Sequence, residues 1–539
     1  MNHIVKYKIL LWLMPVLLLL GAVISPPREA AALTLCTTSD PGHFDPSAMV
    51  AHPADKSWSL LIYERLVQLD PSGETVSPAL ATSWEISDDG KTYRFQLRQN
   101  VAFHSNIFFK PTRFLNADDV VYSFKRLQDQ DHSLYAWNGL NRSEFDQSTL
   151  GIYLTDVRKI SDFEVEFEFS QAHSELLVNF SHDFSSIISA EYGAILTQNQ
   201  SIEDYFRYPV GTGPYRLVSY HKDVLVNLRP FSVTWQQTTL DPNILIVPYE
   251  DEQMRIEKLL QNECDIIPNI SPKNIELMRD QLQIELIKLA STKTIYLAYN
   301  TKAAPMNAPL VRQGLERSIN KFVIQDAIYN NYADILYSPI PSGNWSYNDR
   351  LEGMYGYSIT DSRELFNQAS SLNFDLTLWL PEQATVDMPD PELFVEILAA
   401  DWALAGVQLS AEFVSNDELL RLAADPNRLG AVLLFNQTSQ GAPESYLDQF
   451  RCNSQQNYAH WCNEIFERLM QAADFETDLD IRYEYYLRAQ EVIMEETPIS
   501  PLFSHFLYIP INKQVKGFYL TQQGLYNLIG VTKTRNAQF

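Results

Sequence analysis

Four cysteines restrict the topology of this 539-residue chain more than any other feature of its sequence. An even number of cysteines in an exported chain predicts disulfide bonds. Cys452 and Cys462 are close in the sequence and form the local pair, which leaves Cys36 to pair with Cys264 across more than 200 residues. Such a bridge means that the chain leaves its first domain and later returns to it.

The prediction of disulfides depends on export, and residues 1–32 have the pattern of a secretory signal peptide. Lys6 and Lys8 precede an apolar run over residues 9–24, and three alanines at 30–32 offer a cleavage site of small residues. We therefore expect the leader to be cleaved and the mature protein to be periplasmic.

Two other interpretations of the leader are open. A lipoprotein would carry its lipid on Cys36, but Leu35 is bulkier than a lipoprotein signal accepts at that position. A retained membrane anchor is the second, against which Pro15 and the cleavage-like tail count. No later segment reaches the roughly 18 apolar residues that span a bilayer, so we expect a soluble mature chain.

Composition and charge narrow the class of protein further. With 45% hydrophobic and 12% aromatic residues the chain can bury sizeable cores, and its length predicts two or three domains. The net charge of -26, from 41 basic and 67 acidic side chains, argues against nucleic acid as a partner. It permits a cationic ligand, although surface solvation explains the acidity equally well.

The stretch from residue 430 to 462 has the pattern of one wall of a ligand site. Residues 431–435 form a short apolar run, which predicts a strand that is buried on both faces. At Asn436 the sequence becomes polar (NQTSQGAP), so we expect the chain to leave the strand there. Open α/β sheets bind ligands at such carboxyl ends. The candidate binding residues here are Asn436, Thr438, Ser439 and Gly441, and an ordinary surface turn is the alternative.

Several local elements are predicted by periodicity and capping signals. Asn116 is expected to cap a helix that carries Asp119 in its first turn. Asp88-Asp89-Gly90 predicts the turn of a β-hairpin within residues 79–105. The other predicted elements are strands at 33–36, 163–169 and 215–219 and a helix at 56–66.

Residues 209–215, PVGTGPY, cannot lie inside regular structure because they contain two glycines and two prolines. We expect a crossing between domains or a tight approach of the backbone to another segment. A phosphate-binding loop is a poor alternative because no Lys-Ser/Thr follows.

Six motifs in a fixed order resemble the extracytoplasmic solute-binding proteins of peptide ABC transporters, the group that includes dipeptide- and oligopeptide-binding proteins. The resemblance covers nearly the whole mature chain. Residues 108–121 and 338–348 resemble the Sap peptide-transport subgroup of this family. The six motifs are the hairpin, NADDVVYSFKR at 116–126, PVGTGPYRL at 209–217, YLAYNT at 296–301, the helix VRQGLERSINK at 311–321, and the closing cysteine pair.

The resemblance implies an α/β fold, a two-lobed periplasmic binding protein clamp (type II, cluster C) with an additional α/β domain. It also implies that a peptide is captured between the lobes by hinge closure and delivered to an inner-membrane ABC permease, with no cofactor, and we expect a monomer. The implied parts are lobe I at 33–62, 212–289 and 509–539, the extra domain at 63–211, and lobe II at 290–508.

The sequence departs from the family at both ends of the expected ligand. Relatives place an aspartate four residues before the proline at Pro443, where it pairs with the peptide's amino terminus; this chain has Ser439 there. A hydroxyl cannot compensate an ammonium charge. The arginine that holds the ligand carboxylate in dipeptide binders is replaced near Trp379 by Glu382 and Gln383. We therefore expect a longer or cationic peptide rather than free dipeptides.

Aromatic residues and one histidine complete the candidates, with core packing as the alternative role for the aromatics. The aromatic positions considered are Trp345, Tyr347, Trp379 and Tyr446. The full candidate set for ligand binding is Asn436, Thr438, Ser439, Gly441, Gln383, Trp379, Trp345 and His43.

Three other functions remain as alternatives. Haem or another non-peptide ligand is conceivable, but the histidines show no ligand spacing (for example His43, His52, His104, His182 and His460). A peptide-binding chaperone or sensor could use the same clamp without transport. An enzyme is disfavoured because the chain has no G-x-S-x-G, no H-E-x-x-H and no P-loop, and no metal site is expected.

Overall fold

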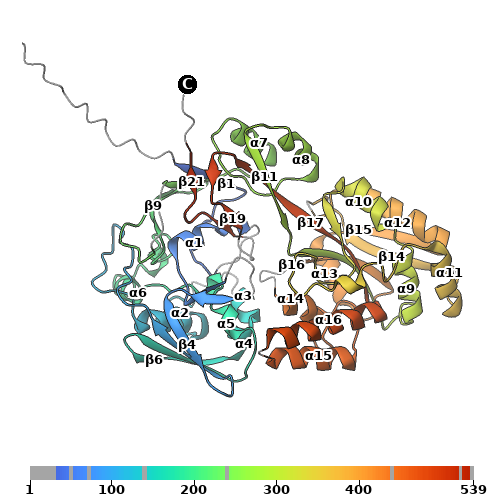
Figure 1. Ribbon diagram of the computed structural model, residues 1–539, viewed down its shortest axis with the longest axis horizontal. Coiled ribbons are helices and arrows are strands. Elements are labelled where there is room, and N and C mark those ends of the chain that lie inside the picture. The colour runs from blue at the N-terminus through green and yellow to red at the C-terminus, as the bar shows by residue number, and fades with distance from the viewer. Residues whose placement is uncertain are drawn as a thin grey trace, which may run out of the picture.

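The computed structural model describes residues 32–47, 53–69, 75–135, 143–236, 242–385, 387–437, 442–476, 478–520 and 525–534. Two α/β bodies lie side by side and are joined by strands at one end (Figure 1). The first body contains β1 (Leu33–Thr37) and the second contains β12 (Lys293–Tyr299). The expected α/β class with two bodies is confirmed. Among the described residues, no helix combines the length and the apolar character needed to cross a membrane.

The first body is built on a sheet that joins distant parts of the chain. Its strand order is β1, β10 (Ile244–Pro248), β9 (Leu225–Pro230) and β8 (Tyr215–His221). β1 pairs with β10 in parallel, and the Cys36–Cys264 disulfide ties the same region together. The predicted return of the chain to its first domain is therefore confirmed, as are the predicted strands at 33–36 and 215–219.

A second sheet in the first body is antiparallel, with strand order β4 (Ala81–Ile86), β5 (Thr92–Leu97), β7 (Glu164–Phe169) and β6 (Leu154–Ser161). The predicted hairpin is confirmed, with its turn at Gly90, whose φ of +68° suits glycine. As predicted, Asn116 caps the helix α2 (Ala117–Gln128) and Asp119 lies in its first turn, and the two residues also form a capping box.

The two sheets of the first body share one hydrophobic core. Side chains of β1, β5 and α2 belong to a single buried cluster, which also includes Ile511 near the end of the chain. Phe95 and Phe124 pack edge-on against Phe180 within it. A continuous core couples the two sheets mechanically, because sliding one past the other would open voids.

The sequence predicted one helix over 56–66, and the structure corrects this to a much shorter one. α1 spans Trp58–Ile62, and Tyr63 is extended. The helix ends because the carbonyl oxygen of Ile62 accepts a hydrogen bond from Gly213 N at 2.9 Å. A Cβ on Gly211 would lie 1.9 Å from the same oxygen. The glycines of PVGTGPY thus allow the predicted tight approach of two backbone segments.

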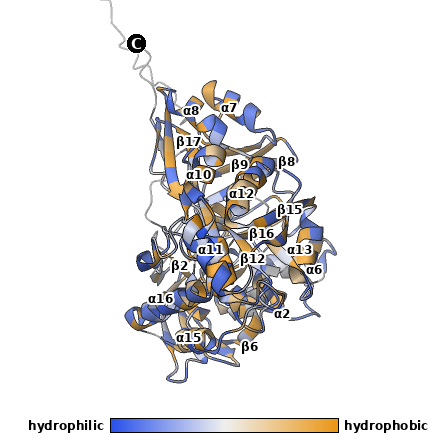
Figure 2. Cartoon of the chain, turned by 90° about the vertical axis from the view of Figure 1, so that its right-hand side faces the viewer, coloured by the Kyte–Doolittle hydropathy of each residue, from blue (hydrophilic) through white to orange (hydrophobic). Residues whose placement is uncertain are grey.

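The second body has a sheet with helices on both faces. Its strands are β12, β16 (Gly430–Gln437), β14 (Phe374–Pro381) and β15 (Val407–Val414). Successive residues of β12 point to opposite faces, so Ile295 and Leu297 enter one buried cluster while Tyr296 enters the other. Figure 2 shows hydrophilic and hydrophobic residues together on α11 (Ile359–Gln368) and α16 (Leu479–Glu496), as expected of helices that cover such a sheet.

The motif VRQGLERSINK was expected to form one helix over 311–321, but it divides between two. α9 spans Pro309–Arg317 and α10 spans Lys321–Tyr329. The break arises because the Asn320 side chain caps α10, accepting a hydrogen bond from Val323 N at 3.3 Å.

One long strand, β17 (Ile499–Asn512), belongs to both bodies. Its residues 506–512 pair with β11 (Ile284–Ala290), and its earlier residues pair with β12 and β13 (Ala333–Ile335). Ile266 bridges both Leu35 of β1 and Ile511 of β17, so the far end of β17 lies against the first body's sheet. The second connection, from β11 to β12, runs beside it (Figure 1).

The remaining helices and short strands complete the two bodies. In the first body the helices are η1 (Pro53–Lys56), α3 (Ser143–Gln147), α4 (Thr149–Tyr153), α5 (Leu176–Asn179), η2 (Asp183–Ser185), α6 (Ala190–Gln198), η3 (Ile202–Asp204), α7 (Glu252–Leu260) and α8 (Pro272–Arg279). Its short strands are β2 (Val67–Leu69), β3 (Val76–Pro78), β18 (Val515–Lys516), β19 (Tyr519–Leu520), β20 (Tyr526–Asn527) and β21 (Thr532–Lys533). The second body adds η4 (Asp349–Leu351), α11 (Ile359–Gln368), α12 (Pro391–Ala405), α13 (Asn416–Ala424), α14 (Pro443–Leu447), η5 (Asp448–Phe450), α15 (Glu464–Phe475) and α16 (Leu479–Glu496).

Replacing Gly211 with alanine tests the close approach. The added Cβ would meet the Ile62 carbonyl oxygen, so the two backbone segments must separate. We expect Gly211→Ala to lower the free energy of unfolding by about 2 kcal/mol, the usual cost of overpacking, with a lower melting temperature by calorimetry. Gly356→Ala is the matched control because a Cβ there meets no atom within 4 Å. Equal melting temperatures for the two variants would contradict the prediction.

The two disulfides should differ in their contribution to stability. They close loops with sequence separations of 228 and 10 residues. In the chain-entropy description the long loop is worth roughly 5 kcal/mol and the short one roughly 3 kcal/mol. We expect the Cys36→Ala/Cys264→Ala variant to melt at a lower temperature than the Cys452→Ala/Cys462→Ala variant. The reverse order would show that native packing, rather than loop closure, decides the effect.

Candidate functional site

The candidate site lies where β14 and β16 end together. The two strands are parallel, with Trp379 opposite Val432, so their carboxyl ends reach the same edge of the sheet. Gln383 follows β14 at this edge and is exposed. Asn436 lies near the end of β16. The structure therefore brings Gln383 and Asn436 to the edge at which α/β sheets bind ligands.

Asn436 was expected to lie outside the strand, and this was wrong. β16 continues through Gln437 because β12 still supplies pairing partners, with Thr294 opposite Asn436. The Asn436 Nδ2 atom is buried and donates no hydrogen bond to any residue that the structure describes. A buried amide without a hydrogen-bond partner is costly.

The residues that follow β16 include three predicted binding residues. Thr438, Ser439 and Gly441 lie outside the described residues, and their role stays a prediction. The described chain resumes at Ala442, and α14 begins directly afterwards.

A charged group at the same edge was missed from the sequence. Lys293 Nζ lies 3.0 Å from Asp387 Oδ2, and His505 Nδ1 lies 3.3 Å from Asp387 Oδ1. Lys293 starts β12 and His505 lies in β17, so both belong to the strands that connect the bodies. Burial lowers the pKa of His505, which outweighs the opposite effect of the Asp387 charge. A histidine inside the apolar run at 499–511 was the signal that could have pointed to this group.

The helix α14 connects the predicted binding loop to the strands that join the bodies. Tyr446 Oη donates a hydrogen bond to the Thr292 carbonyl oxygen at 2.9 Å, between β11 and β12. The Tyr296 hydroxyl donates a hydrogen bond to Gln449 Oε1 at 2.7 Å. A displacement of α14 therefore acts directly on the connection between the bodies. Tyr446, a predicted aromatic position, is buried.

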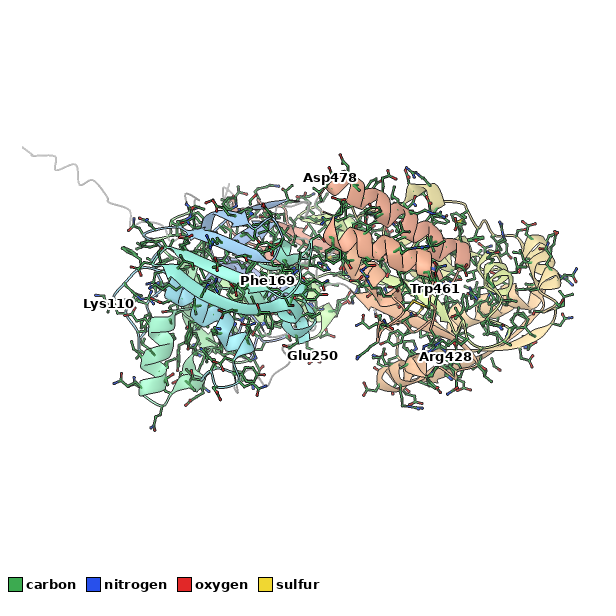
Figure 3. All side chains as sticks on the ribbon, turned by 90° about the horizontal axis from the view of Figure 1, so that it is seen from below. Lys110, Phe169, Glu250, Arg428, Trp461 and Asp478 are labelled. Carbon is green, nitrogen blue, oxygen red and sulfur yellow. A yellow bond between two sulfur atoms is a disulfide. The ribbon has the colours of Figure 1, made fainter. Side chains whose placement is uncertain are left out.

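The second disulfide lies in the segment that follows α14. Cys452 and Cys462 are bonded as predicted, and Cys452 N donates to Glu467 Oε1 at 2.6 Å. Arg428 donates to the Tyr458 carbonyl oxygen at 2.8 Å inside the loop that the disulfide closes. Figure 3 labels Arg428 and Trp461 in the second body.

The two predicted tryptophans take part in packing. Trp379 Nε1 donates to Glu412 Oε2 at 2.9 Å, and its ring lies against Gly430, where a Cβ would approach it to 2.9 Å. The Trp345 ring lies 5.9 Å from that of Tyr486, between centroids. Both side chains are half-buried at the edge of one hydrophobic cluster, and this gives each a structural role.

His43 belongs to the first body, whereas Gln383 and Asn436 belong to the second. Its Nδ1 accepts a hydrogen bond from Asp45 N at 3.2 Å. Burial lowers the pKa of His43, opposed by the nearby Asp45 charge. In the described residues, no group of histidines, cysteines and carboxylates is arranged to hold a metal ion.

The two bodies touch beside α14. Ser174 N of the first body donates to the Asp474 carbonyl oxygen of the second at 2.9 Å. Next to this bond the Glu175 and Glu444 carboxyl groups are hydrogen-bonded to each other. Burial raises the pKa of Glu444 to about 7. Two carboxyl groups in contact cannot both be ionised without a large cost.

Comparison with known proteins agrees with this architecture. A dipeptide-binding protein of Escherichia coli is 30% identical over 95% of this chain and 97% of the relative. The peptide transport periplasmic protein SapA of Salmonella typhimurium is 31% identical over 96% of each. Heme-binding protein A of Haemophilus influenzae is 29% identical over 92% of this chain and 91% of the relative.

The fold is also found among solved structures. HbpA2 of Haemophilus parasuis is 29% identical, covers 94% of this chain and 100% of its own, and superposes with a TM-score of 0.88. The family model for the bacterial extracellular solute-binding proteins, family 5 Middle, matches residues 75–458. The chain is about equally similar in sequence to the dipeptide-binding protein and to SapA. The chain belongs to family 5 of the bacterial extracellular solute-binding proteins.

Proposed function

We propose that this protein is the periplasmic substrate-binding component of an ABC transporter, which captures a peptide between its two bodies and delivers it to an inner-membrane permease. The observation that carries the proposal is the connection between the bodies. Two cores are joined by neighbouring strand segments, β17 and the β11–β12 connection, and few residues need to change conformation for the bodies to rotate.

The proposed moving parts follow the division expected from the sequence. Lobe I and the extra domain, 63–211, move as one unit because their side chains share a continuous core. Lobe II, 290–508, carries the edge with Gln383 and Asn436. The hinge lies near residues 290–293 and 503–506, where the strands change partners. We propose that the protein works as an exported monomer without enzymatic activity.

We propose a longer or cationic peptide as the ligand. Ser439 supplies no charge for a peptide's amino terminus, and Gln383 supplies none for its carboxylate, so the terminal charges contribute little. The net charge of -26 attracts cationic side chains. The unpaired Asn436 amide can donate to a peptide carbonyl. Backbone hydrogen bonds and side-chain charge would then carry the affinity.

Calorimetric titration of three peptides tests this preference. A lysine-rich hexapeptide, a glutamate-rich hexapeptide of the same length and a dipeptide are compared at low and high salt. We expect the lysine-rich peptide to bind at least about tenfold more tightly than the others, a difference of about 1.4 kcal/mol, and to weaken with salt. Tighter binding of the dipeptide, or equal affinities for the two hexapeptides, would contradict the proposal.

Substituting the proposed anchor position tests the role of the loop. Ser439→Asp supplies a carboxylate for an amino terminus, and charge-assisted hydrogen bonds are roughly twice as strong as neutral ones. We expect about tenfold tighter binding of a dipeptide with a free amino terminus, and no gain for the same dipeptide after acetylation. Ser439→Asn is the control because it has similar size without charge. A gain for the acetylated peptide would place Ser439 elsewhere than at the ligand's amino terminus.

Haem is the second candidate ligand, favoured by the likeness to Heme-binding protein A of Haemophilus influenzae. His104 and His182 are buried, and His104 Nε2 already contacts the Gly213 carbonyl oxygen at 2.7 Å. A haem titration followed by absorbance distinguishes the two ligands, since saturable binding that excludes peptide would favour haem. A chaperone or sensor would be indicated if deletion of the permease left uptake of the bound ligand unchanged.

A further inference from the structure

The contact between the two bodies contains a pair of carboxyl groups, Glu175 and Glu444, called the carboxyl pair below. Glu175 precedes α5 in the first body, and Glu444 lies in the first turn of α14 in the second. They are hydrogen-bonded to each other beside the Ser174–Asp474 backbone bond. Glu444 also accepts a hydrogen bond from the Tyr486 hydroxyl. The pair therefore joins parts of the molecule that separate when the bodies rotate apart.

Charge compensation around the carboxyl pair is incomplete. Arg451 is occupied by Asp448 and Asp474, at 2.6 Å from each. Arg482 is then the cation that faces the two carboxyl groups. Glu175 Oε1 is buried and has no hydrogen-bond partner among the described residues. The titratable and charged groups facing the pair from all neighbouring elements are Tyr153, His173, Asp448, Arg451, Glu467, Asp474, Arg482 and Tyr486.

A single proton shared by the two carboxyl groups removes their mutual repulsion. Two carboxyl groups in a buried contact are stable when they share a proton, and strongly repel each other when both are ionised. Burial raises the pKa of Glu175 well above its usual value, with the charges of Glu444 and Asp448 acting in the same direction. Once the bodies separate, both groups return to water and ionise as ordinary glutamates. The form in contact therefore binds one more proton than the separated form.

The sign of the pH dependence follows from linkage. Because the pKa of these groups is raised in the contact, its stabilisation is complete at pH values below the ordinary glutamate pKa. It is lost as the pH rises through the raised pKa of Glu175, which donates the shared proton to Glu444. Burial raises the pKa of Asp474 to about 6 and lowers that of His173 to about 4, so those groups titrate at lower pH.

We infer that Glu175 and Glu444 form a proton-dependent latch, in which one shared proton holds the two bodies in contact and its loss favours their separation. Glu444 lies on the same short helix as Tyr446, whose hydroxyl contacts Thr292 between β11 and β12. The latch thus acts on the helix that joins the predicted binding loop to the hinge. The inference rests on the proposed hinge motion but requires no ligand.

The Ser174 amide reports the latch directly because it donates to Asp474 across the contact. Its hydrogen exchange is measured in the ligand-free protein between pH 6.5 and 8.5 and corrected for the intrinsic pH dependence of exchange. We expect protection to fall about tenfold across this range, within the limit of tenfold per pH unit that the loss of one proton sets. In Glu175→Gln the amide can donate to Glu444 without a titrating proton, but burial still raises the pKa of Glu444, so we expect the pH dependence to be weaker but not abolished.

Two further variants make the result decisive. The double variant Glu175→Gln/Glu444→Gln should remove the pH dependence, since neither position then titrates and the amide oxygen at position 444 can still accept from Tyr486. Glu364→Gln, an exposed residue of α11, should behave as the unsubstituted protein. Melting temperatures confirm that each variant is folded. A pH-independent Ser174 amide in the unsubstituted protein, or the full pH dependence in Glu175→Gln, would overturn the latch. Failure of peptide binding would overturn the proposed function alone, because exchange is read without peptide.

Discussion

A single strand that belongs to two sheets is the constraint on which the rest of the structure depends. β17 pairs with β12 and β13 in the second body and with β11 beside the first. Its backbone hydrogen bonds fix where each body begins, and they leave little freedom except bending at the crossing. The bodies can therefore change their relative orientation without losing either core. Asp387, Lys293 and His505 lie at that crossing, so charged groups lie where the proposed hinge bends.

The short helix α14, of five residues, is connected to three parts of the molecule. It follows the predicted binding loop, Tyr446 contacts the β11–β12 connection, and Glu444 reaches the first body. A ligand that moves this helix would change the hinge and the contact together. Such coupling needs no long pathway through the protein, because one rigid element is shared by all three places.

Much of this could be predicted from the sequence where local chemistry decides the structure. Asn116 and Asp119 predicted the start of α2, and Gly90 predicted a hairpin turn. The positions of the four cysteines predicted both disulfides. Failures occurred where a distant partner decides. α1 stops at Ile62 because Gly213 approaches it, and β16 passes Asn436 because β12 is beside it. Neither partner is visible in a local pattern.

The candidate site was predicted in the same uneven way. Gln383 and Asn436 reach one edge because parallel strands end together, which strand patterns and family motifs anticipate. The group of Lys293, Asp387 and His505 joins three distant segments, and the contact of Glu175 with Glu444 joins two bodies. Such contacts join residues that are far apart in the sequence, so no local sequence pattern predicts them. Trp345 and Trp379 illustrate the opposite case, since aromatic residues near a site also pack ordinary cores.

The bridges from Leu35 to Ile266 and from Ile266 to Ile511 have a consequence for biogenesis. The four-stranded sheet of the first body is formed by residues 33–248, whereas Ile511 of β17 joins it only through Ile266. This sheet can therefore form before the end of the chain is available. The docking of β17 joins residues that are far apart in the sequence, and such contacts form slowly. Assembly of the first body therefore ends with the attachment of the strand that also carries the second body.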